Sequence, residues 1–118
     1  MRLTEIHYPD TPPVEGYGPG FFRIGGEVIR GGLLVLPGLR RAWGGAADLD
    51  DILAAAGRID VLFWGTGTEI AHLDAGLRSR LEAAGLGVEV MASPPACRSF
   101  NVLLGEGRRI GLAVLPVD

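Results

Sequence analysis

The sequence contains no lysine, and all eleven of its basic side chains are arginines scattered along 118 residues. The longest basic runs are the pairs Arg40-Arg41 and Arg108-Arg109, and the formal net charge is −3. Proteins that bind nucleic acid usually show a basic patch or a strongly basic domain, because they must neutralise phosphates. The composition therefore gives no indication of nucleic-acid binding.

Long apolar runs and cysteines are also scarce. No apolar run approaches the roughly 20 residues that a membrane-spanning helix needs, and the first ten residues, MRLTEIHYPD, lack the apolar centre of a secretory signal. The lone Cys97 cannot form an internal disulfide, which fits a reducing compartment. These absences predict a cytoplasmic protein with no membrane insertion.

The residues that are present are typical of a folded protein. Hydrophobic residues make up 47% of the chain and charged residues 21%, which is enough apolar surface to offset the conformational entropy lost on folding. A chain of this length has room for one hydrophobic core. We therefore expect a single domain over residues 1–118.

The first third of the chain has the pattern of strands and turns. In order, we expect a strand at residues 3–7, a loop at 9–20, and a β-hairpin with arms at 21–24 and 27–36. Gly25-Gly26 supplies the positive φ angles that a two-residue hairpin turn prefers. Gly31-Gly32 should weaken or bulge the second arm, and Pro37-Gly38 should end it.

The remainder alternates helices and strands. We expect strands at residues 61–64, 88–91 and 110–115, and helices that begin after Asp48, after Asp74 and at Pro94-Pro95. Leu77, Leu81 and Ala84 form one stripe of the second helix, with Gly85 just beyond its end. This alternation predicts an α/β fold with crossover connections and a largely parallel central region.

The loop Gly65-Thr66-Gly67-Thr68 is the first candidate site. It follows an apolar strand at the carboxyl end, where open α/β sheets bind ligands. Its amides and the next helix are suited to bind a small anion, but the same glycines fit a plain turn. The loop is not a dinucleotide fingerprint, because Ile70 replaces the third glycine, and no P-loop lysine follows.

Arg98 and Asn101 are the second candidate pair. They lie three residues apart on the third helix, so both could hold a carboxylate or phosphate beside the glycine loop. The alternative is an Arg98 that faces solvent and an Asn101 that bonds a loop backbone.

Three further residues have competing interpretations. Trp43, in an expected loop at residues 40–47, is either an exposed interface anchor or a core residue. Cys97 as a nucleophile would need His7 or His72 as a base, and a small buried cysteine is commoner. One cysteine and two distant histidines show no metal-ligand spacing, so we expect neither a metal nor a cofactor.

Several of these motifs together resemble a known family. They are Gly65-Thr66-Gly67 after a strand, Glu89-Val90-Met91 at the end of the next strand, the run ACRSFNVL at residues 96–103, and Glu106-Gly107-Arg108. The combination is similar to the domain of unknown function family 498, the Mth-type domain, which includes a mitochondrial complex I assembly factor. The chain departs from the family pattern at Ser99-Phe100, where Thr-Tyr is common, and at Ser93-Pro94-Pro95.

The resemblance implies a three-layer fold with a central mixed sheet and helices packed on it, in a family with no established enzymatic activity. The function it predicts is a non-enzymatic interaction or assembly-factor-like protein with a protein partner, linked to respiratory-complex biogenesis. The alternative is a binder of a small anionic ligand, or an enzyme, that uses residues 65–68 with Arg98 and Asn101.

Overall fold

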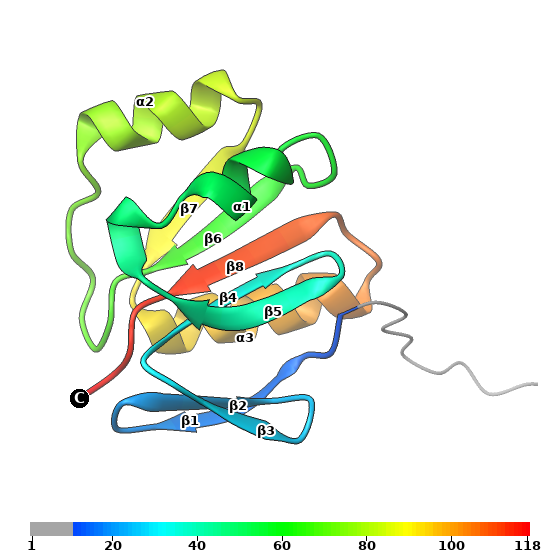
Figure 1. The fold of residues 1–118 in the computed structure, drawn as a ribbon, viewed down its shortest axis with the longest axis vertical. Coiled ribbons are helices and arrows are strands. Elements are labelled where there is room, and N and C mark those ends of the chain that lie inside the picture. The colour runs from blue at the N-terminus through cyan, green and yellow to red at the C-terminus, as the bar shows by residue number, and fades with distance from the viewer. Residues whose placement is uncertain (1–10) are drawn as a thin grey trace, which may run out of the picture.

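The computed structural model describes residues 11–118 (Figure 1). Its strands are β1 (Val14–Gly18), β2 (Phe21–Ile24), β3 (Glu27–Arg30), β4 (Gly32–Leu36), β5 (Leu39–Trp43), β6 (Val61–Gly65), β7 (Gly87–Met91) and β8 (Ile110–Val114). Its helices are the short 3-10 helix η1 (Gly45–Ala47) and the α-helices α1 (Asp50–Ala54), α2 (Ala75–Ala83) and α3 (Ser93–Gly105). The expected strand at residues 3–7 lies outside the described residues.

The larger sheet has five strands in the order β5-β4-β8-β6-β7. β6 runs parallel to both β7 and β8, whereas β4 is antiparallel to β5 and β8. Figure 1 shows α1 and α2 on one side of this sheet and α3 on the other. The predicted α/β class with a central mixed sheet and packed helices is therefore confirmed.

Two apolar clusters fill the spaces on either side of the large sheet. The cluster beneath α1 and α2 contains Ile52, Leu81 and Trp64. The cluster on the α3 side contains Phe100 of α3 and Phe22 of β2, because the antiparallel sheet β1-β2-β3 packs below α3. The small sheet thus shares its core with the large one.

The hairpin around Gly25-Gly26 is confirmed, but the strand expected at residues 27–36 is wrong. Gly25 and Gly26 have φ angles of 58° and 78°, and β2 pairs with β3 on either side of them. Gly31 has a φ of 84°, a conformation that glycine adopts at little cost. The chain turns there, so β3 stays in the small sheet and β4 enters the large one.

Two segments expected to be loops form strands. β1 lies within the expected loop at residues 9–20 and pairs with β2. β5 covers part of the expected loop at residues 40–47 and pairs with β4 across the Pro37-Gly38 turn. Both strands depend on long-range or hairpin pairing more than on local propensity, which explains why their composition did not reveal them.

The helix boundaries are mostly as predicted. The Asp74 side chain accepts a bond from the Leu77 amide at 2.9 Å and caps α2, and Gly85 has a φ of 95° just beyond the end of that helix. Leu81 is fully buried and Leu77 partly buried, whereas Ala84 is exposed. The expectation that Asp48 caps α1 is wrong, because Leu49 occupies the N-cap position and makes no side-chain cap.

Candidate functional site

The predicted glycine loop begins where β6 ends, between β7 and β8. Gly65 pairs with Met91 of β7 and with Val114 of β8. A Cβ atom on Gly65 would lie 2.5 Å from Cγ1 of Val114 and 2.9 Å from Cα of Ser93, the first residue of α3. The close packing of α3 on the strand end therefore accounts for a glycine at this position.

The Thr66 and Gly67 amides of the loop are bonded within the protein. The amide of Gly67 donates to Oγ of Ser93 at 2.8 Å, and the amide of Ser93 donates to the carbonyl of Gly67 at 2.7 Å. The Ser93 hydroxyl in turn donates to the carbonyl of Leu115 at 2.6 Å. The Thr66 amide donates to the carbonyl of Met91 at 2.9 Å. These are the donors on which an anion site at the loop would depend.

The start of α3 adds no replacement donors. Pro94 and Pro95 have no N–H group, and the Ala96 amide donates to the carbonyl of Ala92 at 3.1 Å. The amides of Thr66, Gly67, Ser93 and Ala96 are therefore all bonded within the protein, and none of the four is available to an external anion.

A hollow of about 660 Å³ lies beside this junction, and its polar groups hold the loop itself. The Thr66 hydroxyl donates to the carbonyl of Glu69 at 2.7 Å and accepts from the Ala71 amide at 2.9 Å. The Asp118 amide donates to the Thr68 hydroxyl at 2.9 Å. Glu69 and Asp118 also line the hollow, and their carboxylates give it negative charge, which disfavours an anionic ligand.

Arg98 and Asn101 do not join the glycine loop, and neither lines the hollow beside it. Asn101 accepts from the amide of Val14 and donates to its carbonyl, both at 2.8 Å, so it ties β1 to α3. The exposed Arg98 lines a separate hollow of about 390 Å³ together with Phe63 and Val102. Neither Phe63 nor Val102 was among the predicted site residues. The position of Val102, two residues after the buried Phe100 and so off the buried face of α3, was a signal that this apolar side chain is exposed.

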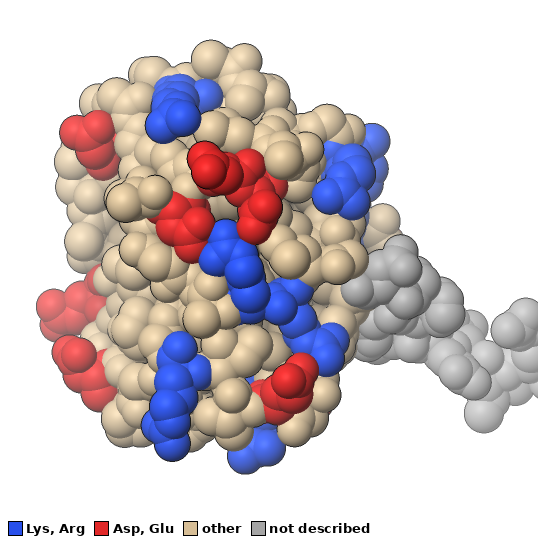
Figure 2. Space-filling view, viewed as in Figure 1, with Lys and Arg blue, Asp and Glu red and all other residues tan. Residues whose placement is uncertain are grey.

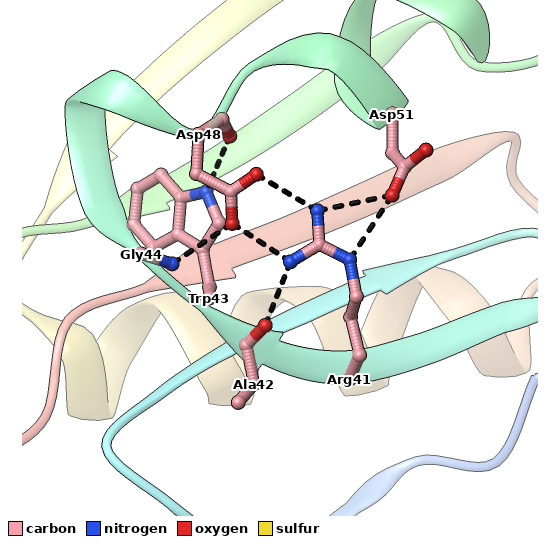
Figure 3. Close-up of polar contacts among 6 residues, drawn as sticks. All are labelled: Arg41, Ala42, Trp43, Gly44, Asp48 and Asp51. Carbon is pink, nitrogen blue, oxygen red and sulfur yellow. Dashed lines mark hydrogen bonds and ion pairs between the residues drawn. The ribbon is translucent and has the colours of Figure 1, made fainter.

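Trp43 lies in the core. The residue is 5% exposed, and its indole N–H donates to the carbonyl of Asp48 at 2.9 Å (Figure 3). The ring meets Trp64 edge-on, with centroids 4.8 Å apart and an interplanar angle of 90°. Of the two roles considered for Trp43, the structure places the side chain in the core instead of on an exposed interface.

A charged cluster covers Trp43 (Figure 3). The Arg41 guanidinium binds both carboxylate oxygens of Asp48, at 2.7 and 2.9 Å, and donates to Asp51 at 3.0 Å. Bonds from Arg41 and from the Gly44 amide lower the pKa of Asp48 to about 2, and Asp48 in turn raises the pKa of Arg41. The cluster holds β5 against η1 and α1, so its role is structural.

Arginines and carboxylates alternate over the face that carries α1 and β5 (Figure 2), where neither sign forms a large patch. Within the described residues, no group of three or more His, Cys, Asp or Glu side chains is placed to hold a metal ion. Burial raises the pKa of the Cys97 thiol to about 12, which opposes formation of the nucleophilic thiolate. In the same part of the chain, no helix is long and apolar enough to cross a membrane.

Residues 14–115 match the family model described as "Protein of unknown function (DUF498/DUF598)". The chain belongs to this family. An uncharacterized protein of Rhodobacter capsulatus is 51% identical over 99% of this chain and 94% of its own length. NADH dehydrogenase [ubiquinone] 1 alpha subcomplex assembly factor 3 of Rattus norvegicus is 27% identical over 98% of this chain. That match spans only 66% of the rat protein.

Solved structures share the fold of this family member. The crystal structure of an outer membrane protein from Bartonella henselae superimposes with a TM-score of 0.86 at 30% identity, and covers 95% of this chain and 100% of its own. The solution structure of a Bordetella pertussis protein, described as a Mth938-like domain, gives a TM-score of 0.76 at 26% identity and covers 98% and 92% of the two chains. The predicted Mth-type resemblance is thus confirmed.

Proposed function

We propose that this family member is a non-enzymatic assembly factor that binds a protein partner during biogenesis of respiratory complex I. The observation that carries the proposal is the similarity to assembly factor 3, which extends over 98% of this chain in the rat protein. The similarity therefore includes both sheets and all three α-helices. We place this role in the cytoplasm, as the sequence predicts.

The motif residues have structural roles in the fold, which supports a protein that binds a partner through its surface. Gly65 gives α3 room to pack, the Ser93 hydroxyl joins the ends of β6 and β8, and Asn101 fastens β1 to α3. These residues make the scaffold rigid, which leaves binding to the surface side chains around it. The anionic-ligand alternative has less support, because the Thr66 and Gly67 amides already have protein acceptors.

Deletion of the gene in the native organism tests the proposal. We expect less fully assembled complex I on native gels and an accumulation of subassemblies, both restored by the parent chain supplied in trans. Complex II measured in the same membranes is the control, and it should not change. Normal amounts of assembled complex I in the deletion strain would refute the proposed function.

Affinity purification of the tagged chain provides an independent measurement. The expected result is enrichment of complex I subunits or their assembly proteins from the soluble cytoplasmic fraction, relative to a strain that expresses the tag alone. Recovery of the chain only outside the cytoplasm would contradict the proposed location.

A further inference from the structure

β7 is an edge strand of the five-stranded sheet, and its backbone directions are fixed by two hydrogen bonds. The Gly87 amide donates to Asp60, and the Met91 carbonyl accepts from Thr66, so both residues turn their polar groups toward β6. Successive residues of a strand alternate. Val88 and Val90 therefore direct their N–H and C=O groups toward the open edge.

Among residues 11–118, one end of this edge is covered and the other is open. The Arg78 guanidinium reaches over from α2 and donates to the carbonyl of Val88 at 3.2 Å. Beside Val90 lies a hollow of about 400 Å³ that Ile70, Leu73 and Arg78 also line. Proteins commonly cover exposed strand edges with charged side chains. Arg78 performs that role at Val88 but leaves the Val90 position accessible.

The α3 side of the sheet is also hollowed, over the strand next to β7. α3 packs mainly against β6 and β8, so Glu89 of β7 remains exposed on that side. The neighbouring hollow of about 390 Å³ combines Phe63 and Val102 with Arg98. Arg98 forms no ion pair with a carboxylate in residues 11–118, so its charge is available to a partner.

Exposed apolar side chains mark both hollows. Ile70 is 68% exposed and lines the hollow that includes Val90 of β7. Val102 is 61% exposed and lines the hollow at Phe63 of β6. The Val90 side chain packs with the cluster under α1 and α2, whereas Phe63 belongs to the cluster on the α3 side. The two hollows therefore lie on opposite faces of the sheet, one at Val90 of β7 and the other at Phe63 of β6, which pairs with Glu89 of β7.

We propose that the β7 edge binds an extended segment of a partner protein, which adds to the large sheet as a sixth strand. Backbone bonds at Val90 would hold the segment, and its alternating side chains would enter the two hollows. An apolar side chain fits over Val102, and an acidic one complements Arg98. No acidic residue should lie directly opposite Glu89, because like charges on paired strands repel. This inference rests on the proposed function and specifies its binding surface.

Selection of random peptides displayed on phage against the parent chain tests the edge without knowledge of the natural partner. We expect extended peptides that carry apolar residues at alternate positions and one acidic residue. A synthetic copy of a selected peptide should protect the Val90 amide from hydrogen exchange. If no peptide is selected, or if the selected peptides leave the Val90 amide unprotected, the proposal is wrong.

Val90→Pro tests the backbone contact. Proline removes an N–H group that points away from β6, so the pairing of β6 with β7 is preserved. Val90→Thr keeps this amide and a β-branched shape, and is the matched control. Peptide affinity should fall about tenfold or more in Val90→Pro and change by about twofold or less in Val90→Thr. Equal losses in the two variants would contradict pairing at the edge.

Arg98→Glu tests the charge with an exposed side chain whose replacement leaves the core intact. Affinity for the acidic peptide should fall about tenfold, and a peptide with lysine at the acidic position should recover binding to this variant. Arg80→Glu, also an exposed arginine but on α2, is the control and should bind as the parent does. Failure of the lysine peptide to recover binding would overturn the assignment of Arg98.

Complementation separates this inference from the proposed function. If Val90→Pro loses the peptide yet restores complex I in the deletion strain, the edge site is wrong and the assembly role stands. If the parent chain binds peptide at Val90 but complex I is normal in the deletion strain, the assembly role is wrong and the edge site stands. Analytical sedimentation tests whether a second copy of this chain occupies the edge. If the parent chain is a dimer and Val90→Pro is a monomer, the proposal of a different partner protein is wrong.

Discussion

At the scale of single residues, several polar side chains fasten one element to another. Asn101 joins α3 to β1, Ser93 joins α3 to the ends of two strands, and Arg41 joins β5 to α1. Within the described residues, no buried side-chain nitrogen or oxygen lacks a hydrogen-bond partner. Loss of one of these side chains should therefore leave a partly buried group unsatisfied, which costs more than the bond itself contributes.

Asn101→Ala should destabilise the protein by about 1–3 kcal/mol, because it leaves the N–H and C=O groups of Val14 without their partner. Denaturant unfolding of the variant and the parent measures the difference. Val102→Ala, at the exposed neighbouring position, is the control and should change stability by about 0.5 kcal/mol or less. If Asn101→Ala also loses only about 0.5 kcal/mol of stability, water satisfies the N–H and C=O groups of Val14 in place of the Asn101 side chain.

The Asp48 carboxylate should make stability depend on acid pH. Its pKa is lowered from 3.8 to about 2 in the folded chain, so its contribution is complete above pH 4 and disappears as the pH falls toward 2. The parent should therefore lose more stability between pH 4 and 2 than Asp48→Asn does, as measured by urea unfolding at each pH. Parallel pH profiles for the two proteins would contradict this assignment.

At the scale of elements, the sequence predicted those with strong local signals and missed those that depend on distant partners. The Asp74 cap, the Pro94-Pro95 helix start and the Gly25-Gly26 turn act within a few residues, and each lies where it was expected. β1 and β5 did not stand out, because their strand character comes from β2 and β4. Asp48 does not cap α1, because its carboxylate binds the distant Arg41 guanidinium and Leu49 stands at the N-cap.

The difference between local signals and distant contacts also explains which features of the candidate site were predicted. The sequence placed the glycine loop correctly at the carboxyl end of β6, because this position follows from the alternation of strands and helices. It could not show that Ser93, 26 residues beyond Gly67, bonds the loop amide. Nor could it show that Asn101 faces Val14 across 87 positions. Contacts at such separations are set by packing and not by spacing.

Gly65→Ala should disturb the junction of β6 and α3. The added methyl would meet Val114 and the Ser93 backbone at 2.5 and 2.9 Å, and overpacking of this kind costs about 1–3 kcal/mol. Thermal unfolding measures the loss. Gly57→Ala is the control, because a Cβ there meets nothing within 4 Å. Equal melting temperatures for the two variants would show that α3 moves to accommodate the added methyl group at no cost in stability.

Leu81→Ala should reduce stability more than Leu77→Ala, although both leucines lie on the inner stripe of α2. Leu81 is fully buried, so its truncation should cost about 2–5 kcal/mol. Leu77 is only partly buried, and its loss should stay near about 1 kcal/mol. Denaturant unfolding ranks the two variants. A larger loss of stability in Leu77→Ala than in Leu81→Ala would show that Leu81 does not lie on the core face of α2.

At the scale of the whole molecule, the two sheets share one apolar cluster, and this should make them unfold together. Phe22 and Ile24 of the small sheet pack in the same cluster as Phe100 and Leu112. Separation of the sheets would expose all of these side chains to water, which is unfavourable. The fold is thus held together by the shared cluster on the α3 side.

We therefore expect one denaturation transition for both sheets. Fluorescence of the two tryptophans reports on the cluster under α1 and α2, and amide hydrogen exchange of β2 reports on the small sheet. The two probes should give the same midpoint and the same free energy of unfolding. A lower free energy for β2 would show that the small sheet opens independently.

Because Cys97 is buried, chemical labelling of its thiol measures how often α3 separates from the sheets. This residue is the only thiol in the sequence, and its side chain lies in the cluster between α3 and the sheets. A thiol reagent can reach it only when that layer separates. The labelling rate at high reagent concentration therefore equals the rate at which α3 lifts from the sheet, with no engineered label required.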